Sequence, residues 1–341
     1  MGNRSFQLLL LGLASTVCMW ASGISYTCDA SLSSSVCDYL NTNISQDYSK
    51  IFTNANAQIY IEASSSGLGE SDQFINATSY NNYVSALTSH EGFHDGTDVT
   101  AVASLPSTEP AIFGTGSVYL TSALSAALGI AGGVGTTSSG TSCTTLNPSS
   151  KTPGCFNGII KINTTQPLFF RDGGTIGSGQ FDFYNVVQHE TDELLGTPSC
   201  IVGSGGVGAD GCNTGMSPAD LFRYSAPGTR SFFSQGNGTT AYFSYDGGNT
   251  VVAPYNNSAN GADYGDWSTS CTYIQDAFGC QGLTLDIAQD TNGNGVRVEV
   301  AALDTVGYNL TPEPGTVALF GLGLAGLFLA RRFASPPDSP M

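Results

Sequence analysis

The chain has 341 residues, with 10 lysines and arginines against 27 aspartates and glutamates, giving a formal net charge of −17. So acidic a surface repels polyanions, which argues against nucleic acid or an anionic lipid surface as a partner. The charge is compatible with cation binding and with solubility outside the cell.

The first 23 residues have the parts of a secretory signal peptide. Arg4 supplies a positive start, residues 8–17 form an apolar core, and residues 21–23 are small. The core is too short to cross a bilayer as a helix. The pattern therefore predicts a signal peptide over 1–23, removed during export.

The body, residues 24–310, carries mixed signals for helices and strands. Residues 24–50 are polar, so we expect a segment that precedes the fold and is closed by a disulfide. The alternation around Ile59 and Ile61 predicts a strand over 57–63. The other expected elements, in chain order, are helices over 79–89, 98–105 and 118–130, a strand over 158–163, a helix over 182–195, a strand entering a turn over 242–248, and a helix over 298–308. No repeat or linker divides the body, so we expect one α+β domain with a mixed sheet and a loop-rich second half.

Eight of the nine cysteines lie outside the signal peptide. An even number in an exported chain predicts disulfides. No C-x-x-C spacing occurs, which disfavours a cysteine-ligated metal. Each neighbouring couple brackets a loop rich in Gly, Ser or Asn, which favours the sequential pairing Cys28–Cys37, Cys143–Cys155, Cys200–Cys212 and Cys271–Cys280.

The expected helix over 182–195 carries the candidate catalytic residues. On a helix, His189 and Glu193 are four residues apart and share one face, and both are competent zinc ligands. Glu190 is rotated by about 100° from His189, where it would act as a general base on a metal-activated water. This is the H-E-x-x-H pattern with Glu193 in place of the second histidine.

The sequence leaves the third metal ligand open. The H-E-x-x-H-x-x-G-x-x-H version of the pattern matches at Gly196 but would place its third ligand at Ser199, a poor donor. We favour Asp220, with Asp263 and Asp266 as rivals. A carboxylate at the second ligand position offsets more of the metal's charge than histidine does, which makes the bound water less acidic.

A second segment spells the pattern without substitution, His90-Glu91-Gly92-Phe93-His94. Gly92 inside the ligand turn costs about 1 kcal/mol relative to alanine. Asp95 and Gly96 follow at once, so the helix would end there. We rank this segment second, either as a separate site or as a source of a ligand for the His189 site.

The C-terminus resembles the PEP-CTERM sorting signal of Gram-negative bacteria. Its parts are Pro312-Glu313-Pro314, an apolar run over 317–330, and the pair Arg331-Arg332, which holds its end of the run on the cytoplasmic side. The resemblance implies a tail over 311–341 that anchors the protein in the inner membrane by a helix. Exosortase-type machinery then processes the tail, and the protein reaches the cell surface, the extracellular matrix or the medium.

Five segments of the body resemble a group of secreted bacterial metalloproteases. They lie at 189–196, 220–228, 242–248, 263–267 and 302–308. The resemblance implies a zincin-like domain over 24–310 that uses zinc to hydrolyse a peptide or protein substrate. It carries over His189 and Glu193 as ligands and Glu190 as the base.

The alternative is a non-catalytic surface or matrix protein that binds polysaccharide or calcium. Its candidate sugar-stacking residues are the aromatics Tyr242, Tyr245, Tyr264 and Trp267. Residues 290–295 match the first half of a calcium loop, but position twelve is Ala301 instead of the bidentate glutamate. A plain Asn/Gly turn is the preferred interpretation of that segment.

Overall fold

A computed structural model describes residues 23–89, 96–110, 117–130, 134–144, 154–202, 212, 215–232, 240–258, 261–289 and 291–311. Its main sheet has four strands in the order β1 (Ser25–Cys28), β2 (Gln58–Ser64), β8 (Gly158–Asn163) and β3 (Gly69–Gln73). The first three strands run parallel, and β3 is antiparallel to β8 at the edge of the sheet. The inward-facing isoleucines Ile59, Ile61, Ile160 and Ile162 are fully buried.

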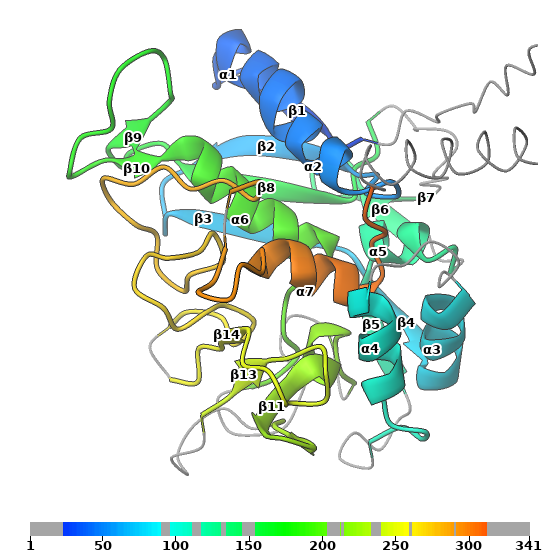
Figure 1. The fold of residues 1–341 in the computed structure, drawn as a ribbon. Coiled ribbons are helices and arrows are strands. Elements are labelled where there is room, and N and C mark those ends of the chain that lie inside the picture. The colour runs from blue at the N-terminus through cyan, green and yellow to red at the C-terminus, as the bar shows by residue number, and fades with distance from the viewer. Residues whose placement is uncertain are drawn as a thin grey trace, which may run out of the picture.

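Helix α6 (Phe183–Leu195) lies against one face of this sheet and packs on β3 and β8 (Figure 1). It begins at Asp182, whose carboxylate accepts the Tyr184 N–H at 2.9 Å, and it ends at Gly196, with φ of 130°. The predicted helix over 182–195 is therefore confirmed. The helix approaches β8 so closely that a Cβ at Gly158 would collide with the Leu194 side chain.

The N-terminal segment carries the predicted disulfide, Cys28–Cys37, but it is a folded part of the core and not a polar lead-in, so that part of the prediction was wrong. It forms β1 and then α1 (Ser34–Tyr39), a π-helical turn η1 (Leu40–Ile44) and α2 (Ser45–Ile51). Leu40, Ile44 and Tyr48 are fully buried because they repeat every four residues and form one apolar stripe. The Tyr48 hydroxyl reaches α6 and donates to Asp192 Oδ1 at 2.5 Å.

The expected helix over 118–130 is half wrong. Residues Ser117–Thr121 form strand β5, antiparallel to β4 (Ile75–Ser79), and only Ser122–Ala127 are helical, as α5. The β-branched and aromatic residues of β5 fit a strand, and Thr121 caps the helix by accepting the Leu124 N–H at 3.2 Å. Nearby lie helices α3 (Tyr80–Ser89) and α4 (Gly96–Ser104) and the hairpin of β6 (Val134–Thr136) and β7 (Ser142–Thr144).

The second half of the body consists of short elements and long loops. The short strands β9 (Leu168–Phe169) and β10 (Phe181–Asp182) pair in parallel before α6. After α6, the turn η5 (Ala219–Phe222) leads into a small sheet ordered β12 (Thr229–Arg230), β11 (Arg223–Ala226), β13 (Tyr242–Phe243) and β14 (Ala253–Pro254). Helix α7 (Val298–Val306) then packs beside α6 (Figure 1). The α+β class is confirmed.

Four disulfides join the cysteines in sequential couples, as predicted. Among the described residues, no helix combines the length and apolar character needed to cross a bilayer. The signal segment 1–22, the histidines at 90 and 94, and the apolar run 317–330 lie outside the described residues.

Candidate metal centre

Three side chains meet at the surface of α6 with the spacing of metal ligands. One donor atom from each of His189, Glu193 and Asp266 lies within 4.8 Å of the others. His189 Nε2 is 3.8 Å from Glu193 Oε1 and 3.7 Å from Asp266 Oδ1. Ligand atoms about 2.1 Å from a tetrahedral zinc lie about 3.4 Å apart, so the two distances from His189 exceed the spacing that zinc requires by only a few tenths of an ångström.

The imidazole of His189 is oriented by a backbone carbonyl from a distant loop. Its Nδ1 lies 2.9 Å from the Ile274 oxygen. A carbonyl can only accept, so Nδ1 donates to it, and Nε2 is the nitrogen that faces the two carboxylates and would bind the ion once its own proton is displaced. This arrangement fixes the metal-binding tautomer of a histidine ligand.

The edge strand β3 orients Glu193. The Ser71 hydroxyl donates to Glu193 Oε2 at 2.6 Å, which leaves Oε1 facing His189. The sequence of β3, Gly-Glu-Ser-Asp-Gln, has no apolar alternation, so neither the strand nor Ser71 was predicted from it.

Glu190 lies beside the cluster and is 5 % exposed. It faces Gly69 so closely that a Cβ at that position would collide with its Oε1 and would lie 2.7 Å from Cγ1 of Val186. Burial and the neighbouring Glu193 carboxylate raise the pKa of Glu190 well above its usual range. The absence of a side chain on Gly69 therefore gives this carboxyl its place beside the metal ligands.

The charge balance of the cluster favours a cation. Burial by itself would lower the pKa of His189, but the carboxylates of Asp266, Glu190 and Glu193 raise it to about 10. Burial raises the pKa of Asp266, and burial together with Glu193 raises that of Asp263 to about 6. A bound cation would offset the repulsion between carboxylates that lie this close together.

The cluster opens into a cleft of about 880 Å³. Its walls come from α6, β3 and the loop 261–280, and no lysine or arginine occurs among the described residues that line it. Asp263 lies at its margin, where the residue as a whole is exposed but its carboxyl is turned inward against Glu193.

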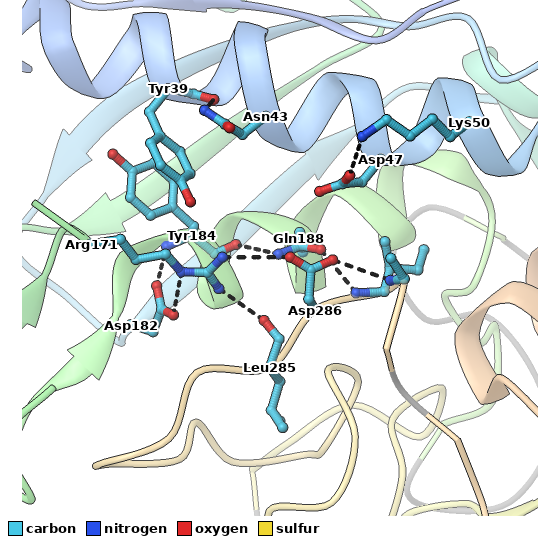
Figure 2. A network of polar contacts seen from close by, with 12 residues as sticks. Tyr39, Asn43, Asp47, Lys50, Arg171, Asp182, Tyr184, Gln188, Leu285 and Asp286 are labelled. Carbon is cyan, nitrogen blue, oxygen red and sulfur yellow. Dashed lines mark hydrogen bonds and ion pairs between the residues drawn. The ribbon is translucent and has the colours of Figure 1, made fainter. Parts of the chain in front are cut away.

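A network of hydrogen bonds joins loop residues 285–287 to the N-terminal half of α6 (Figure 2). Arg171 donates from Nε to Asp182 Oδ2 at 2.7 Å and from Nη2 to the Leu285 carbonyl at 2.9 Å. Gln188 Oε1 accepts the Ile287 N–H at 3.1 Å. The network fixes the loop against the helix that carries His189.

The structure does not bring Asp220 into the cluster. Its Oδ1 accepts the Ser199 hydroxyl at 2.5 Å, and its Oδ2 accepts the N–H groups of Cys200 and Ser217 at 3.0 and 2.9 Å. With both oxygens so engaged, this buried carboxylate fastens the turn before β11. Asp266 occupies the place for which Asp220 had been favoured.

Two of the four aromatic residues of the alternative prediction are buried, and the other two are half-buried. Trp267 and Tyr242 are buried, at 1 % and 8 % exposure, so their faces are not available to a sugar. Asn292 Oδ1 accepts the N–H groups of Asn294 and Val296 at 2.9 and 3.0 Å, which is a plain turn.

The PEP-CTERM protein-sorting motif matches residues 310–332. It indicates recognition by exosortase-type sorting machinery and export to the cell envelope or beyond it. Neither the curated proteins nor the solved structures contain a match to the chain.

Proposed function

We propose that the body is an exported, zinc-dependent peptidase with a zincin-like arrangement of sheet and active-site helix. The observation that carries the proposal is the convergence of His189, Glu193 and Asp266 on one point beside the cleft, with Glu190 adjacent. Three protein ligands with one side open are typical of catalytic zinc sites, whereas structural sites are closed by four.

The residues present fit zinc chemistry. Zinc bound there would polarise a peptide carbonyl and lower the pKa of a coordinated water. Glu190 is the group placed to take a proton at its carboxylate and later return it to the leaving amine.

A peptide substrate is supported by the position of β3. Within the described residues this strand pairs only with β8, so its outer edge is free along the cleft. A free strand edge presents unpaired N–H and C=O groups that an extended peptide chain can pair with. We propose that a peptide or protein substrate binds in this way, with its scissile bond at the cluster.

Sorting and catalysis occupy different parts of the chain. Residues 309–311 pair with the end of α2, through Thr53 N–H to the Asn309 carbonyl and Thr311 N–H to the Ile51 carbonyl, both 2.8 Å. The motif at 310–332 starts there. We propose that its apolar run holds the protein in the inner membrane until the tail is processed.

The donor set favours one second candidate. Two carboxylates with a single imidazole, and Glu190 and Asp263 nearby, form an oxygen-rich site of the kind that calcium prefers. The second candidate is therefore a calcium-binding surface protein without catalysis.

Elemental analysis combined with a peptide-library assay tests the proposal. The purified protein should contain zinc and cleave peptides. Glu190→Gln should keep the zinc and lose about 100- to 10,000-fold in kcat, as expected for removal of a general base. Glu62→Gln, the same change on β2 at a residue outside the lining of the cleft, is the matched control and should stay active. Calcium in place of zinc, or full activity in Glu190→Gln, would contradict the proposal.

A further inference from the structure

A buried acid on α7 lies behind the loop that completes the proposed metal centre. Glu299 is 0 % exposed and sits in the first turn of that helix. It belongs to neither the cluster of three ligands nor the lining of the cleft.

One oxygen of this carboxylate accepts two hydrogen bonds from separate parts of the loop. Glu299 Oε1 accepts from Trp267 Nε1 at 3.0 Å and from the Gln275 backbone N–H at 3.0 Å. Both donors are buried, so each would be left without a partner if the acceptor were removed, and an unsatisfied buried donor is unfavourable.

These two donors are the chain neighbours of the atoms that build the site. Trp267 follows Asp266, the third proposed ligand, and Gln275 follows Ile274, whose carbonyl orients His189. The two segments are joined further by the bond from Trp267 N–H to the Gln275 carbonyl at 2.7 Å. Gln275 Nε2 also donates to the His189 carbonyl at 2.6 Å.

We propose that Glu299 is a positioning residue for the metal centre, whose single acceptor oxygen fixes the ligand Asp266 and the Ile274 carbonyl relative to each other. The inference rests on the proposed metal centre. Groups behind the ligands set the geometry and affinity of metal sites, and their loss typically lowers metal affinity about 10- to 100-fold.

The acceptor, and not the negative charge, is the feature that the geometry requires. Oε2 of Glu299 has no hydrogen-bond partner among the described residues. A glutamine at this position would keep an acceptor oxygen for both donors and would remove a buried charge near Asp192, whose pKa Glu299 helps to raise. A leucine of similar volume would remove the acceptor altogether.

The test measures zinc affinity of the folded full chain by competition with a chelating indicator. Glu299→Leu should bind zinc about 10- to 100-fold more weakly. Glu299→Gln should stay within about threefold of the wild type, because the acceptor is preserved. Leu303→Ala alters a fully buried position on the same helix whose apolar side chain makes no hydrogen bond to the loop; it should destabilise α7 and keep wild-type zinc affinity.

Trp267→Phe covers the case in which Glu299→Leu does not fold. It removes one of the two donors, keeps an aromatic ring against Phe243 and Tyr255, and should weaken zinc binding several-fold. Wild-type affinity in Glu299→Leu or, if that variant is unfolded, in Trp267→Phe would overturn the inference. A loss in Glu299→Gln as large as in Glu299→Leu would also overturn it, because charge would then be responsible.

The outcome separates this inference from the proposed function. A wild-type protein that binds no zinc contradicts the metal centre itself. A wild-type protein that binds zinc, with affinity independent of Glu299, contradicts only the positioning role.

Discussion

The candidate metal centre is assembled from two regions that are built in opposite ways. Helix α6 supplies His189, Glu190 and Glu193 from regular structure whose hydrogen bonds are local. The loop 261–289 supplies Asp266 and the Ile274 carbonyl, and it contains none of the named helices or strands. Its shape depends on contacts with distant parts of the chain. The comparison teaches that helical spacing is enough to predict ligands on α6, whereas a ligand on the loop is placed by tertiary contacts.

Replacing Asp266, the proposed ligand on the loop, should have the largest effect on zinc binding. Asp266→Asn keeps the shape of the side chain but removes its charge, and it should weaken zinc binding by at least about 100-fold, beyond the usual effect of groups behind the ligands. Asp220→Asn should reduce the free energy of unfolding by about 1–3 kcal/mol, because a buried acceptor is lost, and should keep zinc. Chelator competition and thermal denaturation measure the two effects. Zinc lost in Asp220→Asn and kept in Asp266→Asn would reverse the assignment.

A substitution on β3 tests how Glu190 is positioned on the helix side of the centre. Gly69→Ala would push against Oε1 of Glu190 and should lower kcat by about 100-fold, the effect of a catalytic group displaced by about 1 Å. Gly215→Ala is the control, because its Cβ would collide with the Tyr119 ring and the Ser117 carbonyl, neither of which lines the cleft. It should lower stability by about 1–3 kcal/mol and leave the activity of the folded enzyme unchanged. Equal loss of kcat in both variants would show that Glu190 is not specifically placed by Gly69.

Acidification should release zinc. Burial raises the pKa of Glu190 and Asp266, and the surrounding carboxylates raise that of His189 to about 10, so the metal-free centre holds protons that zinc must displace. Affinity should rise up to about tenfold per pH unit for each proton displaced. A group whose pKa is raised in the folded protein stabilises the metal-free fold at pH values below its pKa in the unfolded chain. This contribution to stability is lost as the pH rises through the pKa of the folded state. The increase in Tm on zinc addition should therefore be larger at about pH 8 than at about pH 6, and an equal increase would contradict the account.

The smallest expected effect comes from the disulfide that closes the loop. Cys271 and Cys280 bracket Ile274, and replacing both with serine should lower stability by about 2–3 kcal/mol and weaken zinc binding several-fold. The pair Cys28 and Cys37 has the same sequence separation of 9 and is an equal-length control on the N-terminal segment. Its removal should lower stability alike and leave zinc affinity unchanged. Zinc affinity reduced equally in both would mean that general destabilisation, and not the loop, sets the affinity.

The parts of the fold predicted from sequence are those fixed by local pattern. The spacing in α6, its end at Gly196 and the sequential disulfides could be inferred because each depends on residues near in the chain. Strand β3 could not, because its polar residues form a strand only through pairing with β8. The buried stripe of Leu40, Ile44 and Tyr48 was hidden in a segment of polar composition.

The residues of the candidate site also divide into those that local spacing predicts and one that it does not. His189, Glu190 and Glu193 were chosen by spacing on one helix, and the structure places them together. Asp266 was one of three acids considered, and no spacing rule separates it from Asp220. The two acids differ in the groups that contact them in the fold. Backbone N–H groups and a hydroxyl already donate to both oxygens of Asp220, whereas Asp266 faces His189.

The most direct measurement is zinc stoichiometry of the purified protein, compared with His189→Ala and His90→Ala. The account predicts one zinc per chain in the wild type and in His90→Ala, and none in His189→Ala. Zinc lost only in His90→Ala would move the centre to the earlier motif. No zinc in any form, even after reconstitution, would contradict the metallopeptidase account.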